Sequence, residues 1–527
     1  EWSMRPLGVQ IYNLAYKSGV AWNETAFSNA EFDARHCVAL LVRGEGPATV
    51  VLTGHYDTVT VADYGDLAPL ALRPGALAEA LLGRLAGAEP GTPEGLARRD
   101  LASGRFLPGR GLLDMKAGLA AGLAAVAAFA AEAGRRGNLL FLAVPDEENA
   151  SAGARRAAVE LGPLAAARGL RLRAAVNLDA IADDGDGTAG RVVALGTVGK
   201  VLPTAFVVGV PVHSGFPLRG LNAAVLAAAL ALRLEWAPEL TDESAGEPGT
   251  PVSLLSLKDG KAGYDVTTPG TAFATWSVLN HRRDPSRVLD VVEGLAREAA
   301  RACVAELRAR ALRSGQPAGL VAGAPEVEVM RYGALLARVR AQEPSIDGEL
   351  DADARGLAAG GQALADIAPV LTARLWARSR LTGPAVVLGL GSTPYLATRI
   401  EDEAVREAVE GLVAAAPSRH GVALRAVDYF AGISDMSFLG QADDAAFGRL
   451  AADTPGWAPC VALGRGSVAG VPTINLGPWG RDYHTPLERI ETDYGFRALP
   501  RLLSDLAARL LAANGARSGA EAASGTR

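Results

Sequence analysis

Residues 50–59 read VVLTGHYDTV, an apolar run rich in β-branched residues that ends in Gly-His-Tyr-Asp-Thr. Such a run is typical of a buried strand. Because successive side chains of a strand point to opposite faces, His55 and Asp57 are expected to point the same way. Two interpretations stay open for this pair: the side chains meet at one functional spot, or they form a polar strand end with an incidental hydrogen bond.

Apolar runs of this kind alternate with helical patterns over much of the chain. Strands are predicted at residues 49–57, 138–148, 172–180, 384–391, 421–430 and 471–478. Helices are predicted at residues 115–134, 344–380, 401–416 and 499–513. Nearly continuous apolar strands separated by helices indicate an α/β fold with a mostly parallel sheet that is covered on both faces.

The middle of the chain follows a different pattern. It predicts two strands, a helix at residues 222–235, further strands, a helix at 285–311 and a closing strand at 326–332. This βαββαβ-like order indicates a separate α+β domain inserted into the first. We therefore expect the first domain over residues 1–190 and 336–515, the inserted domain over 191–335, and a disordered tail over 516–527.

Composition and charge exclude several classes of protein. The 527-residue chain has a formal net charge of −6, which argues against a general binder of nucleic acid or of anionic membranes. Its three cysteines, Cys37, Cys303 and Cys460, are too far apart in sequence to indicate a disulfide framework or a Cys-rich zinc site. No signal-peptide pattern is visible, and the longest apolar run, residues 119–131, is shorter than a membrane span. We therefore expect a soluble, cytoplasmic protein.

Side chains that can bind metals recur where the predicted strands end. They are His55, Asp114, Glu147, Glu148, Asp179 and His484. In open parallel sheets, sites form beyond the carboxyl ends of the strands. Imidazole together with carboxylate suits zinc, with manganese or cobalt as substitutes. A pair of divalent ions needs one bridging carboxylate and leaves another free for proton transfer. The neighbours Glu147 and Glu148 fit that division, because adjacent side chains diverge.

Short stretches in a fixed order carry a resemblance to a known family. They are GHYDTV (54–59), GRGLLDMKAG (109–118), PDEENASAGAR (145–155), NLDA (177–180), HSGFPLRGLNA (213–223), GISDMSF (432–438) and GRDYHTPLERI (480–490). Together they resemble the M20 family of metallopeptidases and amidohydrolases and cover most of the chain. The resemblance implies a zinc-peptidase-like catalytic domain with the inserted α+β domain as its lid. The chain length and the helical segment at 344–380 are similar to the arginine-utilisation branch of that family.

The resemblance implies a centre of two divalent metal ions, zinc in the first place. The implied metal ligands are His55, Asp114, Glu148, Asp179 and His484. Asp114 is implied as the carboxylate that bridges the two ions. His55 and Asp179 are then expected on one ion, and Glu148 and His484 on the other.

Three further residues are implied as catalytic. Asp57 resembles the residue that orients the imidazole of its neighbouring ligand and raises its basicity. Glu147 resembles the general base for the metal-activated water. His213, in the lid, resembles a donor of a hydrogen bond to the oxyanion of the tetrahedral intermediate. Whether His213 acts within its own chain or on a partner chain stays open.

Substrate contacts are implied at Asn222, Arg282 and Ser434. Asn222 and Arg282 are similar to lid residues that hold a substrate carboxylate, with Arg283 as an alternative to Arg282. Ser434 and its neighbour Asp435 lie in a stretch that is equally consistent with a plain turn. The acidic run at 183–186 is either a solvated loop or a feature that favours a cationic substrate.

The implied function is hydrolysis of an amide or peptide bond in a small substrate, such as an N-acyl amino acid, a short peptide or a related amide. A catalytically inactive ligand-binding member of the same fold is the alternative, although Glu147 and every implied ligand are present. A nicotinamide-dependent oxidoreductase is disfavoured because no GxGxxG motif lies between a strand and a helix. We expect no nucleic-acid or membrane partner, and the resemblance implies that a homodimer can form through the lid.

Overall fold

The computed structural model describes residues 9–15, 36–182, 191–242, 249–315, 319–323 and 325–513. The chain divides into two compact units. The first contains Glu1–Thr197, Thr398–Ala442 and Gly466–Arg527, and the second contains Val198–Ala397 and Asp443–Arg465. The acidic run at 183–186 and the predicted tail at 516–527 lie outside the described residues.

The first unit is built around an eight-stranded mixed sheet. Across the sheet, the strands are β1 (Val9–Ala15), β2 (His36–Arg43), β5 (Arg136–Val144), β3 (Glu45–His55), β6 (Arg171–Asn177), β18 (Thr473–Asn475), β8 (Val192–Ala194) and β17 (Arg425–Val427). The central strands β5, β3, β6 and β18 run parallel to one another, and β1, β2 and β8 add antiparallel pairings. Val50, Val51 and Leu52 of β3 are fully buried, as their continuous apolar run predicts.

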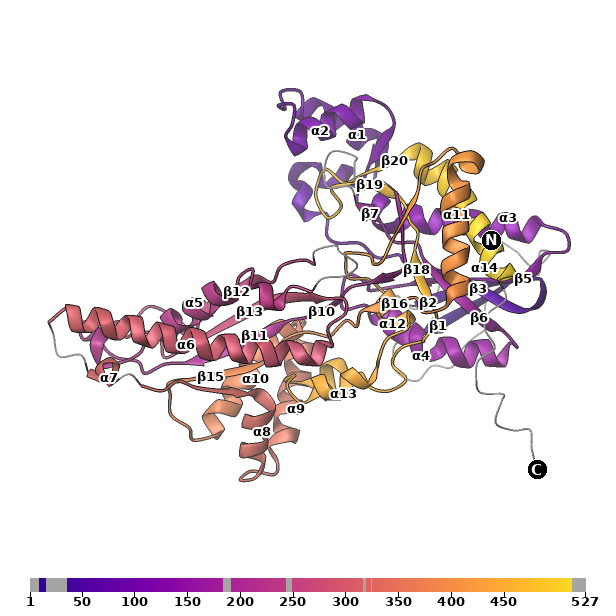
Figure 1. Cartoon of the computed structure of the whole chain (residues 1–527). Helices are drawn as coiled ribbons and strands as arrows, with labels where there is room; N and C mark the ends of the chain where they lie inside the picture. The colour runs from indigo at the N-terminus through magenta and orange to yellow at the C-terminus, as the bar shows by residue number, and fades with distance from the viewer. Residues whose placement is uncertain are drawn as a thin grey trace, which may run out of the picture. The chain divides into compact units, whose positions relative to one another are not determined.

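Helices cover both faces of this sheet (Figure 1). α3 (Ala117–Ala131), α11 (Glu403–His420) and α14 (Leu499–Ala512) pack together on one face, and α4 (Ala152–Ala167) packs against β2, β5 and β6 on the other. By length and composition alone, the stretch Leu112–Ala131 resembles a membrane span, but 61% of its apolar 18-residue window is buried inside the structure. The apolar character of α3 is therefore that of a core helix.

A helical segment between β3 and Asp114 was not predicted from the strand and helix pattern. It consists of η2 (Ala62–Leu70), α1 (Pro74–Arg84) and α2 (Pro93–Ala102). α1 and α2 each begin at a proline, whose fixed φ suits the first helical turn. The segment has a small apolar core of its own. Its helices contact β4 of a four-stranded sheet, made of β4 (Phe106–Pro108), β20 (Arg489–Glu491), β19 (Trp479–Arg481) and β7 (Ile181–Ala182).

The second unit contains a sheet with helices on both faces. Its strands are β10 (Gly199–Val201), β13 (Thr271–Asn280), β11 (Pro203–Val208), β15 (Ala385–Leu390) and β14 (Glu328–Arg331), with β12 (Ser253–Asp259) paired to β13. α5 (Ala223–Leu234) and the long α6 (Val288–Arg313) pack together beside the strands. α8 (Tyr332–Arg340), α9 (Ile346–Ala359) and α10 (Leu364–Arg378) form a second apolar cluster with side chains of β11 and β15. This unit is the inserted α+β domain, and together the two units confirm the predicted fold class.

The extent of the second unit differs from the predicted 191–335. The run at 384–391, expected in the first sheet, forms β15, which pairs with β11 and β14 in the second sheet. All residues of β15 are buried, because helices cover both of its faces. A continuous apolar run is expected for a buried strand in either sheet. The sequence pattern therefore could not show to which of the two sheets residues 384–391 belong. The predicted strand at 421–430 is also shorter, because only Arg425–Val427 pair as β17.

Candidate metal centre

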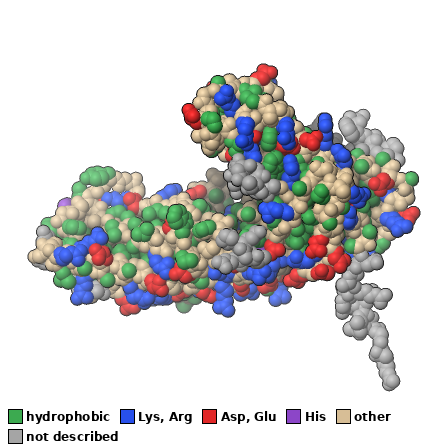
Figure 2. Space-filling view, turned by 45° about the horizontal axis from the view of Figure 1, so that its top comes forward, with side chains coloured by type: hydrophobic (Ala, Val, Ile, Leu, Met, Phe, Trp, Pro, Cys, Tyr) green, Lys and Arg blue, Asp and Glu red, His purple; other side chains and the backbone are tan. Residues whose placement is uncertain are grey.

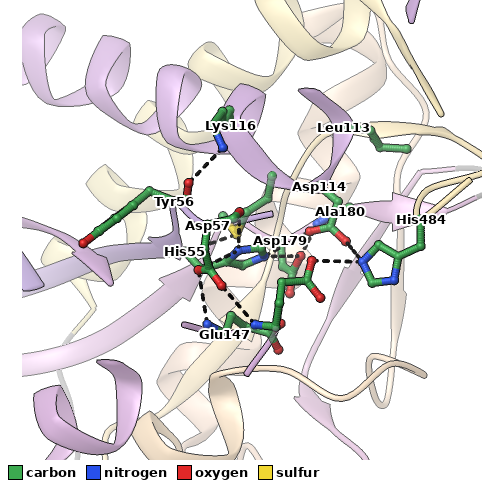
Figure 3. Close-up of polar contacts among 12 residues, drawn as sticks. His55, Tyr56, Asp57, Leu113, Asp114, Lys116, Glu147, Asp179, Ala180 and His484 are labelled. Atoms are coloured by element: carbon green, nitrogen blue, oxygen red, sulfur yellow. Dashed lines mark hydrogen bonds and ion pairs between the residues drawn. The ribbon is translucent and has the colours of Figure 1, made fainter. Parts of the chain in front are cut away.

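The predicted ligands come together at the carboxyl ends of the central parallel strands (Figure 3). β3 ends at His55, and Asp179 follows the end of β6 by two residues. Asp114 lies in the turn η3 (Leu112–Lys116), directly before α3, and His484 lies in the loop between β19 and β20. Glu148 follows the end of β5. Segments far apart in the sequence therefore deliver their side chains to one place.

Asp114 lies between the two histidines. Its Oδ1 is 3.0 Å from Nε2 of His55, and its Oδ2 is 3.1 Å from Nε2 of His484. His55 is 1% exposed and Asp114 8%, whereas the side chain of His484 is 42% exposed. One carboxylate thus presents a different oxygen to each imidazole. That is the arrangement expected of a carboxylate that bridges two cations.

Glu148 and Asp179 complete the cluster, one beside each histidine. Oε1 of Glu148 is 3.0 Å from Nε2 of His484, and Oδ1 of Asp179 is 4.0 Å from Nε2 of His55. Ligand atoms of His55, Asp114 and Glu148 all lie within 4.8 Å of one another. The structure therefore brings together all five residues that the sequence suggested as metal ligands.

Asp57 lies just beyond the strand rather than in it, because β3 ends at His55. The predicted alternation of side chains therefore does not explain how the two residues meet. Asp57 Oδ1 is nevertheless 3.5 Å from Nδ1 of His55. Its two carboxylate oxygens also accept hydrogen bonds from the backbone N–H groups of Glu147 and Glu148, each at 3.2 Å. Asp57 thus connects His55 to the loop that carries both glutamates, a contact that sequence spacing could not reveal.

The cluster contains more carboxylates than groups that can carry a positive charge. Burial, reinforced by the charge of Asp114, raises the pKa of Asp179 to about 7. Burial also acts to raise the pKa of Asp114, but hydrogen bonds from His484 and His55 outweigh it and hold that pKa well below its usual range. Hydrogen bonds to Asp114 and Glu148 raise the pKa of His484 to about 10. These shifts all follow from the excess of buried carboxylate over cationic groups, an excess that bound divalent cations would offset. The donor set of two imidazoles and three carboxylates fits zinc.

Glu147 differs from its neighbour Glu148 in its surroundings. Burial and the charge of Asp435 raise the pKa of the Glu147 carboxyl well above its usual range. Asp435 is 2% exposed, and burial raises its own pKa to about 6. The sequence pointed to Asp435 only as a candidate substrate contact. Its electrostatic effect on Glu147 depends on tertiary packing and has no local sequence signal.

Ser434, predicted as a substrate contact, is fully buried. Its hydroxyl accepts a hydrogen bond from the backbone N–H of Met436 at 3.2 Å, at the start of α12 (Met436–Leu439). This geometry favours the plain-turn interpretation of the stretch, because the side chain has no surface left for a substrate. Ser434 is therefore not among the substrate contacts that we propose.

The predicted lid residues all belong to the second unit. His213 is exposed, and its Nδ1 accepts a hydrogen bond from the backbone N–H of Gly215 at 3.0 Å. A neutral imidazole with Nδ1 as acceptor carries its proton on Nε2, which can then donate. Asn222 Oδ1 caps α5 by accepting from the N–H of Ala224 at 2.9 Å. Its side-chain N–H₂ group is a separate donor, distinct from the oxygen that caps the helix.

Arg282 and Arg283 differ in what their side chains do. Nη1 of Arg283 donates to the backbone carbonyl of Glu239 at 2.6 Å. Arg282 is exposed at the surface of the second unit. The backbone N–H groups of residues 281–283 converge on Oδ2 of Asp242 at 2.7–2.8 Å. The backbone of this turn is therefore fixed by Asp242, the Arg283 side chain donates within the second unit, and the choice between Arg282 and Arg283 as the ligand contact stays a prediction.

Comparisons with known proteins show the family to which this chain belongs. Residues 98–453 match the family model described as Peptidase family M20/M25/M40. The uncharacterized protein YqjN of Bacillus subtilis (strain 168) is 30% identical over 484 residues, covering 91% of this chain and 87% of that protein. Protein RocB of the same organism is 26% identical over 499 residues, covering 93% of this chain and 87% of that protein.

The fold is similar to that of a solved tripeptidase from Staphylococcus aureus subsp. aureus mu50. The TM-score is 0.51 at 14% sequence identity, and the match covers 96% of this chain and 90% of that chain. At this identity the likeness concerns the fold alone. The family model and YqjN, by contrast, match over most of the sequence. The chain therefore belongs to peptidase family M20/M25/M40.

Proposed function

We propose that this protein is a dinuclear metal-dependent hydrolase that cleaves an amide or peptide bond in a small substrate. One observation carries the proposal: the two oxygens of Asp114 face the Nε2 atoms of two different histidines. Family membership supports hydrolysis in general, since the family is one of peptidases. The catalytically inactive alternative lacks a supporting observation, because Glu147 lies beside the cluster with a carboxyl that can hold a proton.

The donor set suggests how two ions would be held. His55 and Asp179 would bind one ion, Glu148 and His484 the other, and Asp114 both. Imidazole and carboxylate ligands favour zinc, with manganese or cobalt as alternatives. When bound, such ions polarise the scissile carbonyl and lower the pKa of water.

Glu147 is proposed as the residue that moves the proton. Its carboxylate accepts a proton from the attacking water and then returns it to the leaving nitrogen. The raised pKa supports this role, because such a carboxyl can hold the proton between the two steps. Asp57 holds the Glu147 and Glu148 backbone through two hydrogen bonds and would thereby orient both side chains.

The lid residues suggest the class of substrate. Nε2–H of His213 is proposed to donate to the oxyanion that forms at the scissile carbonyl. Arg282 and the side-chain N–H₂ of Asn222 are proposed to bind a free carboxylate of the substrate. A substrate with a free carboxylate next to its amide is an N-acyl amino acid or a short peptide. A related amide of the same shape would also fit.

Replacing Arg282 with alanine is expected to raise KM about 10- to 100-fold for a substrate with a free carboxylate, because one charge-assisted hydrogen bond is lost. The same substrate with its carboxylate converted to an amide should show little change. Arg287→Ala is a matched control, since this nearby arginine is largely exposed and pairs at the surface with Asp290. Steady-state kinetics on the wild type, Arg282→Ala and Arg287→Ala measure the KM for both substrates. An unchanged KM in Arg282→Ala would contradict the assignment.

The proposed function predicts that removing metal with a chelator abolishes hydrolysis and that two equivalents of zinc or manganese per chain restore it. The measurement is a metal titration combined with a screen of N-acyl amino acids and dipeptides, basic side chains included. Two bound ions without hydrolysis of any substrate in the screen would favour the inactive alternative. Failure to bind divalent ions would overturn the proposal.

Other expectations stay predictions. Acidic and basic side chains are mixed on the face shown in Figure 2, and the expectation of no nucleic-acid partner stays a prediction from the net charge. In the second unit, Leu232 of α5 is 83% exposed and Trp236 is 72% exposed. These apolar side chains support a homodimer through the lid, which the mass of the protein in solution would check. The cytoplasmic location stays an expectation from the sequence.

A further inference from the structure

The two loops that carry Asp114 and His484 are tied together by a buried glutamate. Glu488 is fully buried and lies between His484 and β20. Its Oε1 accepts hydrogen bonds from the backbone N–H groups of Leu113 and Asp114, at 3.2 and 3.4 Å. Its backbone carbonyl accepts from the N–H of Gly109 at 3.2 Å. The loop after β19 is thus bonded to the turn before α3.

Arg110 compensates the buried charge of Glu488. Its Nη1 donates to Oε2 of Glu488 at 2.9 Å, and its Nη2 donates to Asp63 at 2.5 Å. Arg110 is 3% exposed, and its Nε also donates to the backbone carbonyl of Thr60 at 3.1 Å. A carboxylate buried this deeply is costly unless it is paired and hydrogen-bonded. The two oxygens of Glu488 therefore have different partners, since one faces the arginine and the other faces the backbone beside Asp114.

A second ion-pair network fixes the other side of the His484 loop. Arg489 is fully buried, with Nη2 2.8 Å from Oδ2 of Asp100 in α2 and Nη1 2.5 Å from Oδ2 of Asp482. Asp482 and His484 both have left-handed backbone conformations, with φ of 56° and 62°. Such conformations cost free energy in residues other than glycine and persist where the surroundings enforce them. The helical segment Ala62–Ala102 therefore braces the loop through Asp63 and Asp100.

We propose that Glu488 is a positioning residue that sets the separation of Asp114 and His484, and with it the affinity for the metal ion next to Glu148 and His484. The inference rests on the proposed metal-ligand set. The Glu488 side chain bonds to Arg110 and to the backbone of Leu113 and Asp114. It acts through the backbone of Asp114 and through the loop that it shares with His484.

Glu488→Gln tests the proposal because an amide cannot accept hydrogen bonds on both sides. Its one oxygen can accept either from Arg110 or from the backbone of Leu113 and Asp114, and its N–H₂ group must then face the other donors. We expect the zinc ion next to Glu148 and His484, called the second zinc ion below, to bind about 10- to 100-fold more weakly. Replacing residues that orient metal ligands commonly lowers metal affinity by this factor. Stepwise zinc affinities are measured by competition with a chromogenic chelator, and the unfolding temperature of the metal-free protein is measured in parallel.

Glu491→Gln is the matched control. Glu491 lies in β20 close to Glu488 and is 1% exposed. Its Oε1 accepts from Arg105 at 2.8 Å, and its Oε2 accepts from the backbone N–H of Tyr494 at 2.7 Å. Replacing Glu491 with glutamine therefore also disturbs hydrogen bonds from an arginine and from a backbone N–H group. It does so on the same hairpin, but away from Asp114 and His484. We expect a loss of stability similar to that of Glu488→Gln and zinc affinities like those of the wild type.

The results separate three cases. Weak binding of one ion in Glu488→Gln alone supports the positioning role. Unchanged zinc affinities in Glu488→Gln, or an equal loss in Glu491→Gln, overturn it while leaving the proposed function intact, provided that the wild type binds two ions. If Glu488→Gln does not fold, Arg110→Lys provides the same readout. Lysine keeps the charge but cannot bridge Glu488 and Asp63, so the second zinc ion should again bind more weakly, and unchanged affinity would overturn the proposal.

Discussion

Replacing Glu147 with glutamine is expected to lower kcat by about 10²- to 10⁴-fold, the usual contribution of a general acid–base residue, while both metal ions stay bound. Glutamine has nearly the same shape but cannot accept a proton from water. Glu147 lies outside the proposed ligand set, and its backbone N–H bond to Asp57 does not depend on its side chain. Metal content by elemental analysis and single-turnover kinetics are the two measurements.

Two further variants sharpen this test. Glu147→Asp keeps a carboxylate at a shorter reach and should retain more activity than Glu147→Gln. Glu147→Ala should resemble Glu147→Gln, because both lack a proton acceptor. Normal turnover by Glu147→Gln or Glu147→Ala would remove Glu147 from the mechanism. Loss of metal in either variant would instead place Glu147 among the ligands.

The cluster could be predicted from sequence because its members occupy a repeated position. His55 ends one apolar strand, Glu148 and Asp179 follow two others, and parallel strands end at the same edge of a sheet. Asp114 comes just before a predicted helix and His484 shortly after the last predicted strand, and the resemblance of their surrounding stretches implied their roles. The sequence therefore predicted which residues meet, while the distances between them depend on the fold.

Asp57 was predicted beside His55, but the hydrogen bonds from backbone N–H groups that support the cluster were not predictable in the same way. Asp57 meets the backbone of Glu147 and Glu148, and Glu488 meets the backbone of Leu113 and Asp114. A backbone N–H group is the same in every residue other than proline, so such contacts leave no residue type to recognise.

Strand β15 illustrates a second limit of prediction from sequence. Its apolar residues suit any sheet covered on both faces, so pattern alone could not choose between the two units.

Replacing Asp114 with asparagine is expected to lower kcat about as strongly as Glu147→Gln, but by weakening metal binding. Asparagine has a single acceptor oxygen and no charge, so it cannot face both His55 and His484 as the carboxylate does. Both ions should bind more weakly, and kcat measured at the wild-type metal concentration should fall about 10³-fold, equivalent to about 4 kcal/mol of transition-state stabilisation. Metal titration and steady-state kinetics on the same preparations give both quantities.

Comparing Asp179→Asn with Asp114→Asn distinguishes a ligand of one metal ion from a ligand that bridges both. Asp179 approaches His55, and its Oδ1 also accepts from the backbone N–H of Ala180 at 2.7 Å. As a ligand of one ion only, its replacement should weaken a single binding step and leave the other near the wild-type value. Asp114→Asn should weaken both steps. If Asp114→Asn affected one step alone, as Asp179→Asn is expected to do, then the two oxygens of Asp114 would not hold two ions, and the dinuclear mechanism would lose the observation on which it depends.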